Sequence, residues 1–277
     1  MQGHPEALPS TATAHRRTTG KEWRSTDTMD RAARTRDSIR SRARESALGH
    51  PLMTVYHRLR AQHGPQRWWE GSGTFEIAVG AVLTQRVAWR NAERAVSALN
   101  ARGWLSPERL AEAPVERVAE AIRPALFYNQ KAHRLKGLAS LVVQRYAGDL
   151  DRLLRTEVDR QRATLLSLAG IGPETADAII LYAGGSLSFV IDAYARRVLR
   201  RLGVIAGDEA YDLLRSTFMA HLPADVSLYQ EYHALFVAHG RTVCRRTAPE
   251  CRSCALFDLC AHALAGTDTT ELNPMPA

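Results

Sequence analysis

The fold is decided by residues 165–179, which read LLSLAGIGPETADAI. Apolar residues three and four apart predict a helix on each side of a Gly-Ile-Gly turn. We expect the first helix to end at Gly170, Ile171 to point inward, and Gly172 to adopt a positive φ. Pro173 is preset for the first turn of the second helix. A turn of this kind exposes backbone N–H groups that bind a phosphate of a nucleic-acid backbone, and a purely structural turn is the alternative.

Outward from this hairpin, the sequence predicts short helices separated by glycine and proline. Apolar residues recur at helical spacing from about residue 51 onward. The only strand-like run, residues 187–191, is short enough to be an extended loop. These patterns predict an all-α fold. The helices are expected over residues 75–83, 92–99, 110–122, 135–146 and 210–218.

The composition is that of a basic protein. The chain has 277 residues and a formal net charge of +8, so it should attract polyanions such as nucleic acids. Almost all of the positive residues are arginines, because Lys21, Lys131 and Lys136 are the only lysines. No run of about 18 apolar residues predicts a membrane span, and the N-terminus lacks the apolar core of a secretory signal. We therefore expect a cytoplasmic protein with no membrane partner.

The two ends differ in composition from the rest of the chain. Residues 1–46 are rich in Arg, Ser, Thr and Ala and hold few large apolar residues, which predicts a disordered basic arm. A solvated tail without function, or a true start at Met29 or Met53, is the alternative for this arm. Residues 265–277 are also expected to form a disordered tail.

One carboxylate lies where a new helix begins. Asp192 follows the apolar run Phe189-Val190-Ile191 and comes twenty residues after Gly172. An aspartate at this place is well suited to cap the helix that follows. For an isolated residue, capping alone would be the preferred interpretation.

The four cysteines lie close together in the sequence. They are Cys244, Cys251, Cys254 and Cys260, all within seventeen residues. Disulfides are disfavoured in the cytoplasm, and structural zinc sites usually combine two tight pairs, whereas only Cys251 and Cys254 are closely paired here. Four thiolates in one compact loop suit a [4Fe-4S] cluster, with zinc as the alternative. Nearby arginines would present positive charge to a nucleic-acid backbone; they are Arg241, Arg245, Arg246 and Arg252.

Together, the hairpin and Asp192 resemble the endonuclease III-like DNA glycosylase superfamily, which combines a helix-hairpin-helix with a catalytic aspartate. The resemblance implies an enzyme of base excision repair that binds damaged double-stranded DNA, flips a base out and hydrolyses its bond to the sugar. It implies that Asp192 stabilises the cationic sugar as the base departs, and can orient the attacking water. The cysteine spacing also matches the cluster loop of this superfamily. The hairpin residues expected to contact DNA are Gly170, Ile171, Gly172 and Thr175.

The same resemblance implies two helical lobes with a DNA-binding groove between them. A six-helix lobe, residues 71–185, would end in the hairpin. The second lobe would combine residues 47–70 with residues 186–264 and would carry Asp192 and the iron–sulfur loop. We expect a monomer associated with the nucleoid.

A lysine that defines part of this superfamily is absent. Bifunctional members carry it two residues after the second hairpin glycine, where its amine attacks the sugar and forms a Schiff base. Glu174 holds that position here, and no lysine follows Lys136. This difference puts lyase activity in doubt and predicts a monofunctional glycosylase that uses water as its nucleophile.

A closer resemblance, to the bacterial 3-methyladenine DNA glycosylase III branch, rests on several segments that occur in the same order. That branch also carries Glu at the lysine position. An alkylated purine such as 3-methyladenine is cationic, so it leaves readily, and an aromatic face attracts it. The matching segments are Trp68-Trp69, Gly80–Gln85, Arg123-Pro124, Tyr128–Ala132, residues 170–179 and Tyr229–His233.

The flipped base needs a pocket, and the gap that it leaves needs a plug. Trp68 and Trp69 are candidates for the stacking face, beside Tyr194 and Glu174; helix packing or core burial is the alternative for the aromatic residues. In the superfamily, the plugging residue follows the first core helix. Gln85 and Arg86 match this place, and a simple helix-end role is the alternative.

Two other functions stay open. One is an endonuclease III-type enzyme that removes oxidised or mismatched pyrimidines, with some lyase activity at abasic sites. The other is a non-catalytic module that recognises damaged or bent DNA, although Asp192 counts against it. The sequence also leaves the preferred damaged base and the opposite base open.

Overall fold

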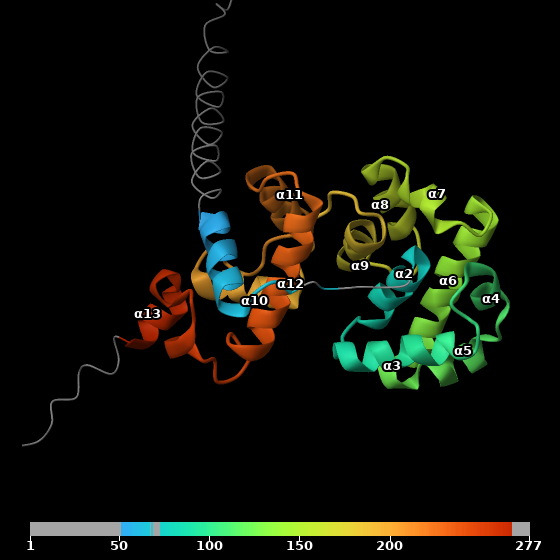
Figure 1. Ribbon diagram of the computed structural model, residues 1–277, viewed down its shortest axis with the longest axis horizontal. Coiled ribbons are helices and arrows are strands. Elements are labelled where there is room, and N and C mark those ends of the chain that lie inside the picture. The colour runs from blue at the N-terminus through green and yellow to red at the C-terminus, as the bar shows by residue number, and fades with distance from the viewer. Residues whose placement is uncertain (1–50, 67, 69–72, 268–277) are drawn as a thin grey trace, which may run out of the picture. The chain divides into compact units, whose positions relative to one another are not determined.

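The computed structural model of the protein describes residues 51–66, 68 and 73–267, which form helices joined by loops, with no strand among them (Figure 1). The all-α prediction is confirmed, and residues 187–191 form the extended loop that was expected. Within these described residues, no helix is long and apolar enough to span a membrane. The arm predicted over residues 1–46 lies outside the described part of the chain. So do residues 268–277 of the predicted tail, whereas residues 265–267 belong to the last helix.

The helices have the following bounds, after a first helix over residues 51–63. They are α2 Thr74–Leu83, α3 Trp89–Asn100, α4 Pro107–Glu112, α5 Val115–Ala121, η1 Arg123–Ala125, α6 Tyr128–Tyr146, α7 Leu150–Leu154, α8 Val158–Leu166, α9 Pro173–Ala178, the π-helix η2 Ile179–Ala183, α10 Ala193–Leu202, α11 Tyr211–His221, α12 Val226–Thr242, the short 3₁₀ turns η3 Cys251–Ser253 and η4 Phe257–Leu259, and α13 Ala261–Thr267.

One helix predicted from the sequence is in fact two. The segment 110–122 is divided between α4 and α5, because Pro114 lacks the N–H that a continuous helix requires. Ser106 caps α4 by accepting a hydrogen bond from the N–H of Arg109, and Pro107 occupies its first turn. The short helices therefore begin and end where local sequence signals place them.

The first group of helices packs around α6. This helix contacts α2, α4, α5 and α7, while α2 also contacts α3, α9 and η2. Leu135, Leu138 and Val142 of α6 are fully buried, as are Val79, Val82 and Leu83 of α2. These apolar faces form the core from which the hairpin helix α9 projects toward the candidate site.

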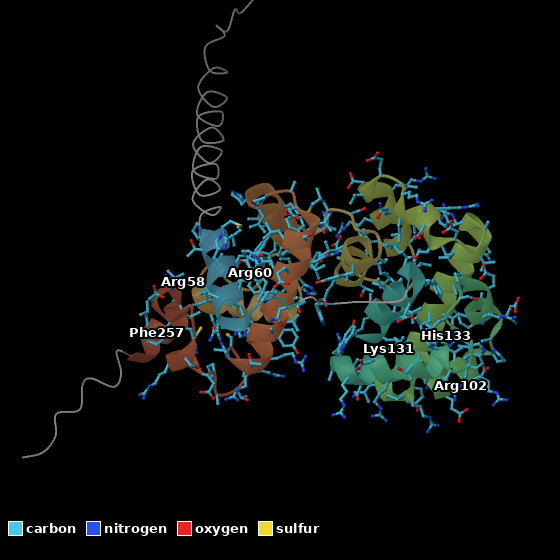
Figure 2. The ribbon with its side chains drawn as sticks, viewed as in Figure 1. Arg58, Arg60, Arg102, Lys131, His133 and Phe257 are labelled. Carbon is cyan, nitrogen blue, oxygen red and sulfur yellow. The ribbon has the colours of Figure 1, made fainter. Side chains whose placement is uncertain are left out.

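Lys131 is buried inside this group (Figure 2). Its Nζ donates to the carbonyl oxygen of Leu83 at 2.8 Å and to that of Ala125 at 2.6 Å. Burial and then the charge of Arg134 lower the pKa of Lys131 to about 8. The side chain thus satisfies carbonyls at the ends of α2 and η1.

The second group of helices packs around α12, which contacts α10 and η2. Aromatic rings fill its core, with Phe189, Tyr232 and Phe236 all buried and in mutual contact with Phe218. The Tyr232 hydroxyl donates to the carbonyl oxygen of Leu52, which ties the first helix to α12. Arg58 of that helix donates to the carbonyl oxygen of Ala255, close to Phe257 in the cysteine loop (Figure 2).

A buried ion network links the hairpin helix to the loop before α10. Asp177 of α9 is fully buried, and its Oδ1 lies 3.0 Å from Arg162 Nε and 3.2 Å from Arg215 Nε. The hydroxyl of Ser188 donates to the same Oδ1 at 2.6 Å. Ser188 lies in the extended loop that ends at Asp192, so this network holds the beginning of that loop against α9.

Candidate active site

The hairpin predicted at residues 165–179 is present, with two corrections: its first helix ends at Leu166 and not at Gly170, and the positive φ lies at Gly170 and not at Gly172. The first helix, α8, ends at Leu166, and the turn runs to Gly172. The positive φ belongs to Gly170, at 81°, whereas Gly172 is extended with φ −90°. A Cβ on Gly170 would lie 2.2 Å from Arg134 Nε, so both the backbone and the space require glycine there. Ile171 is buried as expected, and Gly170 and Gly172 are exposed.

Gln85 connects the end of α2 to the hairpin. Its Nε2 donates to Thr175 Oγ1 at 2.9 Å and to the carbonyl oxygen of Gly170 at 3.2 Å. Arg134 donates to its Oε1. Arg86, the next residue, is exposed and has a positive φ of 55°. Of the two residues predicted to plug the DNA, Gln85 therefore lies against the hairpin and is held by three polar contacts, whereas Arg86 is exposed.

Asp192 begins α10, as predicted. Its Oδ1 accepts a hydrogen bond from the N–H of Ala195 at 2.7 Å, which caps the helix. The side chain is nearly buried, and its Oδ2 lies 3.6 Å from Nε2 of His233 on α12. Oδ1 is therefore engaged in capping, whereas Oδ2 is available on the side of the cavity described below.

A cavity of about 1180 Å³ brings most of the predicted residues together. Its wall takes residues from α2, α9, α10 and α12 and from the loop that precedes α3. Among the predicted site residues, the lining includes Trp68, Gln85, Arg86, Glu174, Thr175, Asp192 and Tyr194. The hairpin residues 170–172 and the four cysteines do not line it. Trp69 lies outside the described residues.

Glu174 projects from the first turn of α9 into this cavity. The surrounding protein and then the negative charge of Asp192 raise the pKa of Glu174 to about 7, while His233 and Arg196 act in the opposite direction. Its side chain remains in contact with solvent in the cavity. A carboxyl group in this state can donate or accept a hydrogen bond near neutral pH.

Trp68 contributes an aromatic face to the same wall. Its ring lies 5.3 Å from the ring of His233, 5.8 Å from that of Trp89 and 5.9 Å from that of Tyr182, centre to centre. Trp68 therefore packs on core rings and also lines the cavity, and its role as a stacking face for the flipped base stays a prediction. Tyr194 lines the same cavity from α10. The guanidinium of Arg197 lies 5.1 Å from its ring centre.

The cavity wall is strongly positive. Seven arginines line it, against the two carboxylates Glu174 and Asp192. They are Arg86, Arg196, Arg197, Arg200, Arg241, Arg245 and Arg246. Three of these donate to backbone carbonyl oxygens: Arg196 to that of Glu209, Arg197 to those of Cys244 and Gly240, and Arg245 to that of Ala248. Such a wall attracts a polyanion and can thereby bring a reactive centre of that polyanion close to the two carboxylates.

The four cysteines are free thiols in the loop between α12 and α13. Arg201 donates to Cys244 Sγ at 3.3 Å, and the N–H of Leu256 donates to Cys254 Sγ at 3.4 Å. Burial raises the pKa of Cys251 and Cys254, and the other thiols in the loop raise both further. Within the described residues, no three His, Cys, Asp or Glu side chains are arranged so that they could hold a single metal ion.

The structure adds His233 and Tyr182 to the residues around Asp192. Tyr182 Oη lies 2.7 Å from His233 Nδ1 and donates to the carbonyl oxygen of Gln230. The sequence placed His233 only within a matching segment and gave it no role. No sequence spacing predicts that His233 contacts Asp192, because the contact depends on how α12 packs on α10.

Comparisons with known proteins agree with this geometry. Residues 79–224 match the family model described as HhH-GPD superfamily base excision DNA repair protein. A protein of Methanocaldococcus jannaschii named as a DNA repair glycosylase is 41% identical over 211 residues, covering 76% of this chain and 95% of that protein. The endonuclease III of Sulfolobus acidocaldarius is 30% identical and covers 69% and 82% of the two chains.

Solved structures show the same fold. A non-covalent endonuclease III–DNA complex superposes with a TM-score of 0.68 at 21% identity, covering 81% of this chain and 98% of that one. The H. pylori 3-methyladenine DNA glycosylase bound to 1,N6-ethenoadenine superposes with a TM-score of 0.59 at 26% identity, covering 71% and 97%.

Proposed function

Because the chain belongs to the HhH-GPD superfamily of base excision DNA repair proteins and is a DNA glycosylase, we propose that it removes alkylated purines such as 3-methyladenine by hydrolysis. The observation that carries the proposal is Glu174. This residue holds the place of the Schiff-base lysine and faces the same cavity as Asp192. A carboxyl group cannot form an imine with the sugar, so water must be the nucleophile.

No other amine in the described residues can take the place of that lysine. Lys131 Nζ is bonded to two carbonyl oxygens inside the core, and Lys136 Nζ is bonded to the carbonyl oxygens of Ala111 and Ala113. Neither residue lines the cavity. Asp192 then serves as the anion that stabilises the sugar cation while the base departs.

Binding of the base follows from the aromatic and acidic wall. A cationic purine gains from the face of Trp68, and the neighbouring Glu174 can accept a hydrogen bond from it. The H. pylori glycosylase, whose name gives 3-methyladenine as its substrate, supports this choice of base. The arginines of the cavity wall, with the exposed hairpin turn at Gly170 and Gly172, would hold the DNA backbone.

We propose that the four cysteines hold a [4Fe-4S] cluster, which would order the loop and present its arginines to DNA. The residues fit this group, because four free thiols accompany N–H donors to Cys244 and Cys254. A four-iron core is wider than one ion, so it can take sulfurs that do not converge on a single metal. Nothing in the proposed hydrolysis requires the cluster to transfer electrons.

The test is release of bases from duplexes that contain 3-methyladenine, 1,N6-ethenoadenine or thymine glycol, with and without later alkali, and with borohydride present in parallel. We expect release of the methylated base, strand breaks only after alkali, and no covalent adduct with borohydride. Cleavage at thymine glycol without alkali, with a trapped adduct, would instead establish the endonuclease III-type activity that the Sulfolobus relative's name suggests.

A gain-of-function variant sharpens the test. Glu174→Lys restores an amine at the position where the superfamily places it, and Glu174→Gln serves as its control. We expect a borohydride-trapped adduct with the lysine variant only. Trapping by the wild type and the Gln variant alike would show that another amine attacks the sugar.

A further inference from the structure

One buried nitrogen beside Asp192 has no hydrogen-bond partner among the described residues. His233 is 5% exposed, yet its Nε2 meets no donor or acceptor within hydrogen-bond distance. Asp192 Oδ2 lies 3.6 Å from this nitrogen, and both residues line the cavity. Leaving a buried ring nitrogen unpaired costs free energy, so this position calls for a functional explanation.

The other ring nitrogen fixes which form of the imidazole is present. The Tyr182 hydroxyl donates to the carbonyl oxygen of Gln230 at 3.1 Å, so its oxygen is the acceptor for His233 Nδ1 at 2.7 Å. Burial and the nearby charges of Asp192 and Glu231 raise the pKa of Tyr182, which keeps the phenol protonated. In this arrangement we assign the proton of the neutral imidazole to Nδ1, which leaves Nε2, 3.6 Å from Asp192 Oδ2, as an acceptor.

We propose that His233 is the general base of this glycosylase: Nε2 and Asp192 Oδ2 together bind the attacking water, and Nε2 takes its proton. The proposal rests on the hydrolytic route proposed above and does not depend on which base is removed. Two acceptors 3.6 Å apart can each receive one hydrogen of the same water, which leaves the water's oxygen lone pair free to attack the sugar.

The step balances as follows. The bond between C1′ and the base breaks, and its electron pair leaves with the base, so that a cationic alkylpurine departs neutral. The water oxygen forms a bond to C1′, and one water proton passes to Nε2. The products are the free base, an abasic-site hydroxyl and an imidazolium, which later returns its proton to solvent.

Assigning the proton to His233 keeps Asp192 ionised throughout. Its Oδ1 already accepts the Ala195 N–H, and its charge is needed while the sugar is cationic. If Asp192 took the proton, the anion would be lost when it stabilises the reaction most. With His233 as the base, Asp192 keeps its negative charge while the sugar is cationic.

The charges that face the imidazole favour the transfer. Asp192 at the start of α10 lies 3.6 Å from Nε2, so its carboxylate stabilises the imidazolium that forms, and Glu174 on α9 lines the same cavity. Arg196 on α10 lines the same cavity with the opposite charge, and the phenol of Tyr182 is neutral. Trp68, whose tilted ring lies 5.3 Å from that of His233, centre to centre, packs against the imidazole.

The experiment is the single-turnover rate of base release between pH 5 and 9 for the wild type, His233→Gln and Glu174→Gln, on the duplex that the wild type cleaves fastest. The wild-type rate should fall on the acid side as the base is protonated. His233→Gln should be about 10²-fold slower at pH 8 and should lose that acid limb. Glu174→Gln should keep it, which assigns the limb to His233.

Two further readouts separate chemistry from structure. Binding to a duplex with a tetrahydrofuran abasic analogue should stay within about threefold of the wild type in His233→Gln, and added imidazole should restore rate to His233→Ala. If the Gln variant does not fold, His233→Asn replaces it, since its amide can still donate to Tyr182. A His233→Gln rate within about threefold of the wild type, with the acid limb intact, overturns the proposal. A borohydride adduct in the wild type would instead overturn the hydrolytic route itself.

Discussion

At the scale of single residues, Glu174 ties the charge of the cavity to pH. Its pKa rises from an ordinary 4.5 to about 7 because the protein surrounds it and Asp192 is near. The folded protein therefore binds this proton more tightly than the unfolded chain, and wild-type stability should fall as pH rises from about 4.5 to about 7. Glu174→Gln removes this dependence. The difference in unfolding free energy between the wild type and Glu174→Gln should stay below about 1 kcal/mol, because solvent in the cavity screens the charge of Glu174.

Thermal unfolding of both proteins at pH 5, 6, 7 and 8 measures this difference. The two unfolding curves should agree best at pH 5 and separate as pH rises, with the Gln variant the more stable. A constant separation at every pH would contradict the raised pKa of Glu174.

Leu126 stores backbone strain at the surface. Its φ is 50° and its ψ 163°, a region in which glycine alone is comfortable, and its side chain is 53% exposed. Leu126→Gly should raise the free energy of unfolding by about 1 kcal/mol, measured by urea titration. Leu213→Gly is the matched control, because Leu213 is 57% exposed but lies in the helix α11. Glycine in a helix lowers the free energy of unfolding, here by about 1 kcal/mol. Equal effects of both changes would contradict the strain at Leu126.

At the scale of the elements, Asp177 determines how α9 is joined to the loop that leads into α10. It is fully buried between Arg162 and Arg215 and accepts from Ser188. Asp177→Asn removes the charge that both guanidinium groups require, so we expect a loss of about 3–5 kcal/mol in unfolding free energy. Asp151→Asn, in an exposed pair with Arg155, should cost less than about 1 kcal/mol. Similar losses from the two variants would show that the buried network adds no stability.

The limits of sequence prediction also lie at this scale. The hairpin, the cap at Asp192 and most helix positions follow from local signals, which is why they could be predicted. The break at Pro114 was missed because the apolar spacing continues across it. The positive φ was assigned to Gly172 instead of Gly170, because two glycines in one turn carry the same local preference. The contact between His233 and Asp192 depends on tertiary packing, which no spacing rule encodes.

At the scale of the whole molecule, the arginine wall should govern how DNA binding depends on salt. Each phosphate contact contributes about one to the slope of log Kd against log salt. Arg246→Ala should weaken binding to undamaged and damaged duplexes alike and reduce this slope by about one. Arg155→Ala is the control and should leave the slope unchanged, because Arg155 is exposed directly after α7 and lies outside the cavity lining. An unchanged slope in Arg246→Ala would exclude this side chain from the DNA contact.

The cysteine loop should couple metal content to the stability of the whole chain. Arg201 of α10 donates to Cys244 and to the carbonyl oxygens of Arg245 and Arg246, so the loop and α10 are joined. The purified protein should contain about four iron atoms. Cys254→Ser should lower both iron content and the unfolding temperature, whereas Ser253→Ala, its neighbour in η3, should lower neither. One zinc ion per chain in place of iron would contradict the cluster.

The near absence of lysine has a consequence for how this protein can be regulated and handled. In the described residues, both lysine ammonium groups are engaged with backbone carbonyls, and every cation that lines the cavity is a guanidinium. A guanidinium stays charged at any physiological pH and is not a substrate for acetylation. The cavity wall therefore offers no ammonium group to acetyltransferases or amine-reactive labels, so fluorophores or surfaces attached through amines leave it unmodified.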